Sequence, residues 1–129
     1  MAIYAIDFDN TLAITRFPEI IAPNKKMVAF AKTVKAQGHK IILWTSRAGA
    51  DLENAVEWCR LQGLAFDAVN EPLPEQLKRW GTDTRKIYAD YYIDDKNMTI
   101  AQLLLFSLSA MKHFPFWKMR RNLSTYRSS

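Results

Sequence analysis

The sequence predicts an α/β protein, a three-layer α/β/α sandwich around a mainly parallel sheet. Short apolar runs alternate along the chain with segments whose apolar residues recur at helical spacing, a pattern typical of parallel sheets with crossover helices. The first run, over residues 2–8, is apolar almost throughout, as in strands that are covered on both faces. With 129 residues, 49% hydrophobic and 24% charged, the chain has the length and composition of one globular domain. Disordered and fibrous proteins are therefore excluded.

The first half of the chain predicts two strands, each followed by a helix. After the run over 2–8, apolar residues recur at helical spacing over residues 24–37. Asn24 is suited to the N-cap of this helix, and Gly38 to the position after its end. Residues 40–44 form a second apolar run, and helical spacing returns over residues 51–62.

The second half continues the same alternation with shorter elements. Residues 65–69 form a weaker strand candidate, followed by two prolines and a short helical segment over 75–80. Residues 91–93 form the fourth predicted strand, and the last helix is expected over 99–111. No predicted helix lies between the first strand and residue 24.

The charges are distributed unevenly. All 13 acidic residues lie at or before Asp95, whereas residues 96–129 carry six basic residues and no acidic one. Anionic partners would therefore be attracted to the C-terminal quarter. We expect one domain over residues 1–112 and a basic, aromatic tail over 113–129. This tail either packs on the protein or contacts an anionic surface such as nucleic acid or lipid.

The expected compartment is the cytoplasm. Cys59 is the single cysteine, so an internal disulfide is excluded. The first ten residues do not resemble a signal peptide. The longest apolar run, over residues 100–111, is shorter than the roughly 18 residues of a membrane span.

Polar side chains follow three of the predicted strands, at the edge where parallel α/β sheets bind ligands. These residues are Asp7, Asp9 and Thr11 after the first strand, Thr45, Ser46 and Arg47 after the second, and Asp94 and Asp95 after the fourth. Four carboxylates at one edge would repel one another by about 4 kcal/mol per pair at ~4 Å, so we expect a bound cation. Oxygen ligands favour Mg²⁺, with Asp7, Asp9, Asp94 and Asp95 as candidate ligands.

The same residues supply the parts of phosphoryl transfer. A carboxylate can attack phosphorus to give an aspartyl-phosphate, while a cation, a lysine and hydroxyl donors neutralise charge on the phosphoryl oxygens. In an extended segment, residues i and i+2 point to one side. Asp7 and Asp9 are therefore expected to face one substrate, and a general acid must also protonate the leaving oxygen.

Four motifs in order make the sequence resemble the haloacid dehalogenase (HAD)-like phosphohydrolase superfamily. The first motif, DxDxT, is matched by DFDNT at residues 7–11, and the second, a Thr or Ser that ends an apolar strand, by Thr45. The third is a lysine, for which we choose Lys86, and the fourth is an acidic pair, matched by Asp94 and Asp95. The resemblance implies a Rossmann-like fold. The segments over 12–23 and 70–85 are too short for the cap domains of this superfamily, so we expect a capless member.

The resemblance also implies a role for each matching residue. Asp7 would be the nucleophile and a Mg²⁺ ligand, and Asp9 the general acid/base that also offers its carbonyl oxygen to the metal. Asp94 and Asp95 would complete the metal site, with Asp95 favoured as the direct ligand. The residues expected to bind the phosphorylated substrate are Thr11, Thr45, Ser46, Arg47 and Lys86, with Lys78 and Arg85 as alternatives to Lys86.

The predicted function is therefore a Mg²⁺-dependent phosphatase acting on a phosphorylated small molecule or on a phosphorylated macromolecule end. One alternative is a phosphatase for nucleotides or polynucleotide ends, indicated by the basic tail and the open site. Another is a module that binds phosphate or accepts a phosphoryl group without turnover. Receiver domains combine similar residues, but their acidic pair ends the first strand and their phosphoacceptor follows later, which is the reverse of the order here.

Overall fold

The computed structural model describes the backbone of residues 1–110 and the side chains of residues 1–105. The chain divides into two compact units, Met1–Asp95 and Lys96–Ser129. All eight predicted polar residues that follow strands lie in the first unit. The expected domain boundary at residue 112 stays a prediction, and the predicted tail over 113–129 lies outside the described residues.

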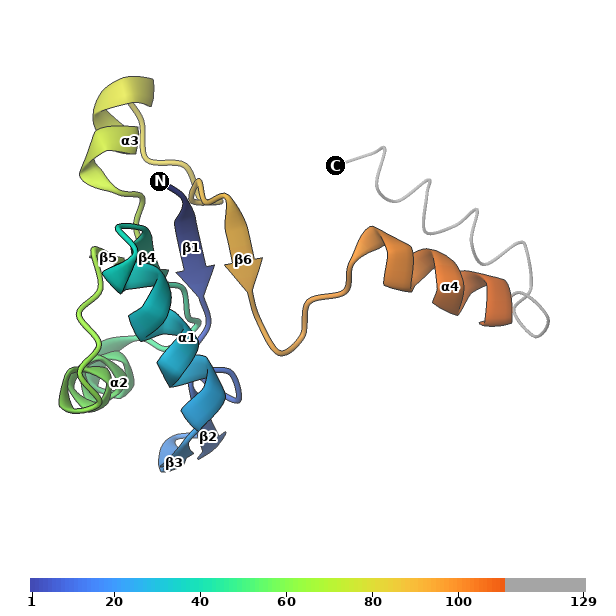
Figure 1. Ribbon diagram of the computed structural model, residues 1–129, viewed down its shortest axis with the longest axis horizontal. Coiled ribbons are helices and arrows are strands. Elements are labelled where there is room, and N and C mark those ends of the chain that lie inside the picture. The colour runs from blue at the N-terminus through green and yellow to red at the C-terminus, as the bar shows by residue number, and fades with distance from the viewer. Residues whose placement is uncertain (111–129) are drawn as a thin grey trace. The chain divides into compact units, whose positions relative to one another are not determined.

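A four-stranded parallel sheet forms the centre of the first unit (Figure 1). Its strands, in spatial order, are β5 (Ala68–Val69), β4 (Lys40–Leu43), β1 (Ile3–Ile6) and β6 (Tyr91–Ile93). Every neighbouring pair is parallel. The predicted α/β class with a mainly parallel sheet is therefore confirmed, and β1 lies between the strands that precede the other two polar segments.

Helix α1 (Lys25–Ala36) follows the sequence prediction closely. The Asn24 side chain accepts a hydrogen bond from the Met27 N–H at 3.4 Å and caps the helix. Val28, Ala31 and Val34 form its buried face, at the spacing that brings side chains onto one side of a helix. The helix ends before Gly38, whose φ of 90° lies in the region that favours glycine.

The next two helices differ slightly from the predicted bounds. Helix α2 (Gly49–Leu61) starts earlier than residue 51, since Gly49, with a φ of 56°, lets the chain turn directly into the helix. Helix α3 (Pro74–Trp80) starts with proline, which suits a first-turn position, and stops at Gly81 in a left-handed conformation. Strand β5 is shorter than the predicted run over 65–69.

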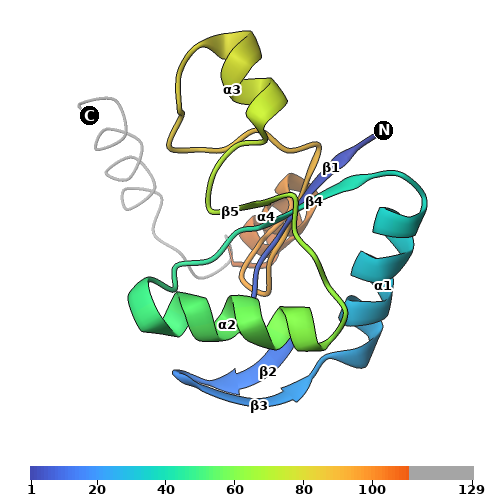
Figure 2. The same cartoon turned by 90° about the vertical axis from the view of Figure 1, so that its left-hand side faces the viewer.

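An antiparallel hairpin that the sequence analysis did not predict occupies the segment after the first motif. It consists of β2 (Ala13–Arg16) and β3 (Glu19–Pro23). In both views the hairpin lies beside α2, while α3 lies at the opposite end of the unit (Figures 1 and 2). The β1 and β6 arrowheads point away from α3 and toward the hairpin (Figure 1), so the carboxyl ends of these strands face the hairpin.

The two faces of the sheet are covered differently. One face packs against α1 and α2, in a cluster whose largest fully buried side chain is Phe8. The other face packs against side chains from the segments on either side of α3, namely Leu73, Ile87 and Ala89. Within Met1–Asp95, α3 itself has no buried residue. Helices on both faces, as in the predicted three-layer sandwich, stay a prediction.

The second unit begins with a helix, α4 (Ile100–Ala110), close to its predicted bounds. The Thr99 hydroxyl accepts a hydrogen bond from the Gln102 N–H at 3.0 Å, and the Gln102 side chain accepts one from the Thr99 N–H at 2.9 Å. This reciprocal pair is a capping box. Among the described residues, no helix combines the length and the apolar character needed to cross a membrane.

Candidate active site

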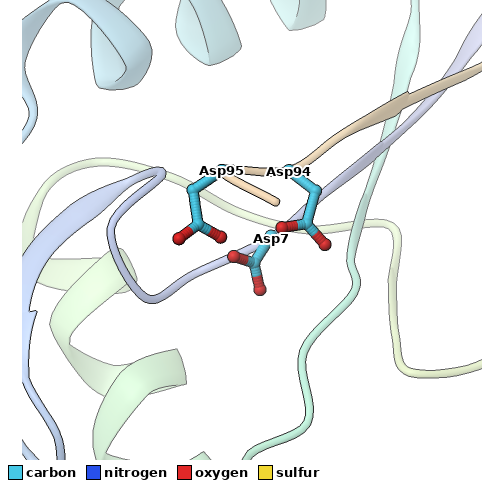
Figure 3. Close-up of side chains that lie close together, drawn as sticks. All are labelled: Asp7, Asp94 and Asp95. Atoms are coloured by element: carbon cyan, nitrogen blue, oxygen red, sulfur yellow. The ribbon is translucent and has the colours of Figure 1, made fainter. Parts of the chain in front are cut away.

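Three aspartates meet at the carboxyl ends of β1 and β6 (Figure 3). The strands pair Ile6 with Ile93, and the Asp7 N–H continues the ladder by donating to the Ile93 carbonyl oxygen at 2.9 Å. Asp7 and Asp94 therefore follow paired residues on adjacent strands. One carboxylate oxygen from each of Asp7, Asp94 and Asp95 lies within 4.8 Å of the others. Parallel pairing thus joins the first and fourth predicted motifs, which are far apart in the sequence.

The position of Asp7 is electrostatically unfavourable for a carboxylate. Burial, followed by repulsion from Asp94, raises the pKa of Asp7 from 3.8 to about 6. Thr11 is buried, with 4% of its surface exposed. Its hydroxyl donates a hydrogen bond to Asp7 Oδ2 at 3.2 Å, which lowers the pKa of Asp7 and so opposes the rise. Thr11 was predicted to bind substrate, and the structure places it against Asp7. The ionised form of Asp7 is therefore less favourable here than in water.

The donor set fits a hard divalent cation. At ~5 Å and an effective dielectric constant of 20, each pair of like charges costs about 3 kcal/mol, which a bound cation would offset. The three donors are carboxylate oxygens, which suit Mg²⁺, Mn²⁺ or Ca²⁺ better than metals that favour nitrogen or sulfur. Asp7, Asp94 and Asp95 are three of the four predicted metal ligands.

The fourth predicted ligand, Asp9, has different partners. Its Oδ2 accepts from Arg47 Nε at 2.9 Å, and its Oδ1 accepts from Arg47 Nη2 at 2.8 Å. The Thr15 hydroxyl also donates to Oδ1, at 2.7 Å. Burial alone would raise the pKa of Asp9, but the hydrogen bonds from Arg47 and Thr15 hold it below its ordinary value. Asp9, the predicted general acid, is thus stabilised as a carboxylate.

Arg47 is the buried partner in this pair, with a side chain that is 1% exposed. Its guanidinium lies 5.0 Å from the centroid of the Phe8 ring and 5.1 Å from that of Phe17. The remaining nitrogen contacts are to main-chain oxygens, from Nη2 to Pro18 at 3.1 Å and from Nη1 to Asp51 at 3.3 Å. Arg47 is one of the residues predicted to bind substrate, and in the structure its guanidinium contacts Asp9.

Thr45 lies at the carboxyl end of β4, where its backbone N–H is bound by a side chain that follows β5. Its N–H donates to Asn70 Oδ1 at 2.8 Å, and its hydroxyl accepts from the Arg47 N–H at 3.1 Å. Asn70 has a φ of 53°, a left-handed conformation that asparagine tolerates better than most residues. Sequence reasoning missed this role for Asn70, although an asparagine directly after a predicted strand was a signal. Ser46, the next predicted substrate ligand, is exposed.

The structure separates the three basic candidates for the third motif. The Lys86 ammonium lies 5.1 Å from the centroid of the Tyr92 ring. Tyr92 pairs with Ala5, and both side chains pack on the same face of the sheet. Asp7 follows Ala5 by two residues, so it is expected on that face as well. Lys78 belongs to α3, at the end of the unit opposite the hairpin (Figures 1 and 2). Arg85 precedes Lys86 directly, and both residues are exposed, so exposure does not distinguish them.

The site thus contains two carboxylates in opposite electrostatic settings. Asp7 lies among other carboxylates, whereas Asp9 lies against a buried arginine. Carboxylates whose pKa values are pushed apart are typical of sites that use one as nucleophile and the other in proton transfer. Thr45 follows β4, the strand next to β1, and its hydroxyl adds a donor for an anionic ligand. This arrangement is chemically suited to binding a cation and a phosphoryl group together.

Comparisons with known proteins give one informative match. No protein-family model matches the chain, and no curated protein matches it. Among solved structures, the chain is similar to a conserved protein encoded by a locus of Bacteroides thetaiotaomicron, with 34% sequence identity and a TM-score of 0.67. The match covers 88% of this chain and 93% of that one. At this identity over nearly the full length of the relative, the protein belongs to the same family as the conserved Bacteroides thetaiotaomicron protein.

Proposed function

We propose that the protein is a Mg²⁺-dependent phosphomonoester hydrolase of the HAD-like superfamily, with that superfamily's three-layer α/β/α fold and no cap domain. The observation that carries this proposal is the grouping of Asp7, Asp94 and Asp95 within 4.8 Å at the carboxyl edge of the sheet. The order of the four motifs along the chain supports it. The proposed substrate is a phosphorylated small molecule or macromolecule end.

In the proposed reaction, one Asp7 carboxylate oxygen attacks phosphorus. The bond from phosphorus to the ester oxygen breaks as an acyl phosphate forms on Asp7, and the departing alcohol oxygen takes up a proton. Water then attacks the phosphorus of the acyl phosphate, which releases inorganic phosphate and restores Asp7. A divalent cation bound by Asp7, Asp94 and Asp95 would lower the repulsion between the carboxylates and the phosphoryl oxygens.

Asp9 is the proposed group for both proton transfers. It would give a proton to the leaving oxygen and later take one from the attacking water. Because both of its oxygens accept hydrogen bonds from Arg47, which favour the ionised form, protonation of Asp9 works against this stabilisation. Thr45, Ser46 and Lys86 are the proposed donors to the phosphoryl oxygens.

Phosphate release from a panel of phosphomonoesters, with Mg²⁺ or with EDTA, tests this function. We expect turnover that requires Mg²⁺ and is lost in Asp7→Asn, which keeps the size of the side chain but removes the nucleophilic charge. Glu53→Gln is the matched control, because Glu53 is exposed on α2 and outside the carboxylate group. Turnover that persists in Asp7→Asn or in EDTA would contradict the proposal.

A second candidate is a phosphoacceptor module, and the pairing of Asp9 with Arg47 favours it. If the pair with Arg47 keeps Asp9 from taking the proton from water, an acyl phosphate on Asp7 would persist. Incubation with Mg²⁺ and acetyl phosphate, followed by intact-mass measurement, distinguishes the two. A stable phosphoryl adduct in the wild-type protein, absent in Asp7→Asn, would indicate the module. The polynucleotide alternative stays a prediction, because its basic residues over 113–129 lie outside the described part.

A further inference from the structure

Arg47 joins three segments that are separated in the sequence. Asp9 lies in the loop after β1, Pro18 in the turn between β2 and β3, and Asp51 in the first turn of α2. The guanidinium contacts all three, through two hydrogen bonds to the Asp9 carboxylate and one to each main-chain oxygen. These contacts make one side chain the link between a candidate catalytic residue, the hairpin and a helix.

The contact between Arg47 and Asp9 fixes the orientation of the Asp9 carboxylate as well as stabilising its charge. Two parallel N–H···O bonds from a planar guanidinium fix the position and the plane of a carboxylate. The Phe8 and Phe17 rings contact the guanidinium at 5.0 and 5.1 Å, and the Arg47 side chain is 1% exposed. The guanidinium therefore has little freedom to rotate, and the Asp9 carboxylate takes its orientation from it.

We propose that Arg47 is a positioning residue that sets the direction of the Asp9 carboxylate and holds the β2–β3 hairpin to it. Arg47 acts through Asp9 and does not contact the substrate. The catalytic half of this proposal rests on the proposed hydrolase, whereas the hairpin half rests on the contacts to Pro18 and Phe17 alone. The role differs from substrate binding, which would require an exposed guanidinium.

Three variants of the full-length protein test the proposal. Arg47→Met keeps an apolar side chain of similar length between the aromatic rings but removes all four hydrogen bonds. Arg47→Lys keeps the charge but not the two-pronged geometry. Arg60→Met is the matched control, because Arg60 makes the same kind of paired contact with Glu57, at 2.9 and 2.7 Å, on the exposed surface of α2.

Two measurements are made on each variant. Steady-state kinetics on an aryl phosphate with Mg²⁺ give kcat and KM separately, and hydrogen–deuterium exchange over residues 13–23 reports opening of the hairpin. In Arg47→Met we expect kcat to fall about 100-fold, the size of effect that a misplaced catalytic group produces. KM should be unchanged, and exchange in the hairpin should be faster.

Arg47→Lys should remain close to Arg47→Met in kcat, because a lysine does not orient a carboxylate. Wild-type kcat in Arg47→Lys would overturn the proposal by showing that charge alone suffices. A raised KM with unchanged kcat in Arg47→Met would also overturn it, since that result marks a substrate ligand. Arg60→Met should leave both measurements unchanged.

Two further outcomes keep the test decisive. If Arg47→Met does not fold, Arg47→Lys decides the catalytic half alone, since its kcat should fall at unchanged KM and wild-type kcat would overturn the proposal. If the wild-type protein shows no turnover that Asp7→Asn removes, the proposed hydrolase fails. Hydrogen exchange then decides the hairpin half, which unchanged exchange in Arg47→Lys and Arg47→Met would refute.

Discussion

Replacing Asp7 by asparagine should stabilise the metal-free protein at neutral pH. The folded protein holds the ionised Asp7 carboxylate in a partly buried position beside Asp94, and the pKa of Asp7 is raised from 3.8 to about 6. The folded state therefore binds a proton at Asp7 more tightly than the unfolded chain does. Asparagine removes the charge and keeps an oxygen that can accept the hydrogen bond from Thr11.

The size and the sign of the effect follow from this shift. A rise of about 2 pKa units corresponds to about 3 kcal/mol. Because the folded pKa is raised, the stability that Asp7 contributes is fully present below about pH 4 and is lost as the pH rises through about 6. Above this window, Asp7→Asn should be more stable than the wild-type protein by up to about 3 kcal/mol, and below it the two should be equal. For a chain of this size, the gap corresponds to a rise in Tm of roughly 10 °C.

Thermal melts of both proteins in EDTA, at about pH 3.5 and about pH 7.5, measure the gap on each side of the window. Adding Mg²⁺ at the higher pH should raise the Tm of the wild-type protein more than that of Asp7→Asn. Asp9→Asn is the matched control, since the pKa of Asp9 is lowered and its ionised form stabilises the fold, so this variant should be less stable at neutral pH. Equal or lower stability of Asp7→Asn at about pH 7.5 would refute the reasoning.

Three other predictions concern the fold around the site. Asn24→Ala should lower the free energy of unfolding by about 1 kcal/mol, because it removes the acceptor for the Met27 N–H; urea denaturation measures this, and an unchanged midpoint would contradict the capping role. The buried Cys59 thiol, whose pKa burial raises to about 12, should react with iodoacetamide at neutral pH only after denaturation; rapid alkylation of the folded protein, read by mass spectrometry, would show that the thiol is reachable. A double-mutant cycle of Asp9→Asn and Arg47→Met should give a coupling free energy of about 2 to 3 kcal/mol, and additive effects in urea denaturation would argue against the bidentate pair.

Sequence patterns predicted the parts of the structure that depend on local periodicity. The apolar runs located β1, β4 and β6, and helical spacing located α1 to within a residue at each end. Because parallel strands bring their carboxyl ends to one edge, the positions of the polar residues that follow these strands could be predicted from the strands themselves. The grouping of Asp7 with Asp94 depends in addition on β1 and β6 being neighbours in the sheet, an order that the apolar runs do not specify.

The hairpin was not predictable in the same way. Its strands have four and five residues, and burial alternates along most of their length, but apolar residues occupy exposed positions as well as covered ones. Ala13 is buried, while Ile14 and Ile21 are about half exposed or more, at 50% and 58%. Because isoleucines stand at exposed positions, neither strand sequence carries the alternation of apolar and polar residues that indicates a strand.

The pairing of Arg47 with Asp9 shows a different limit. These residues are 38 positions apart, and nothing in either local sequence specifies the other as a partner. An arginine that follows a strand end suggests an exposed ligand for an anionic substrate, which is the role that the sequence analysis assigned. Burial between two phenylalanine rings depends on where the hairpin folds, and the hairpin itself was not predicted.

Two cationic partners would control the two aspartates of the first motif independently. A divalent cation held by Asp7, Asp94 and Asp95 would stabilise the ionised Asp7 that the metal-free fold disfavours. Arg47 already stabilises the ionised Asp9, so this carboxylate needs no metal ion. Metal binding would therefore favour the ionised nucleophile, whereas proton donation by Asp9 would first require its protonation against the stabilisation that Arg47 gives to the ionised form. If the proposed hydrolase is correct, leaving groups that need no proton should react fastest, because they avoid this second step.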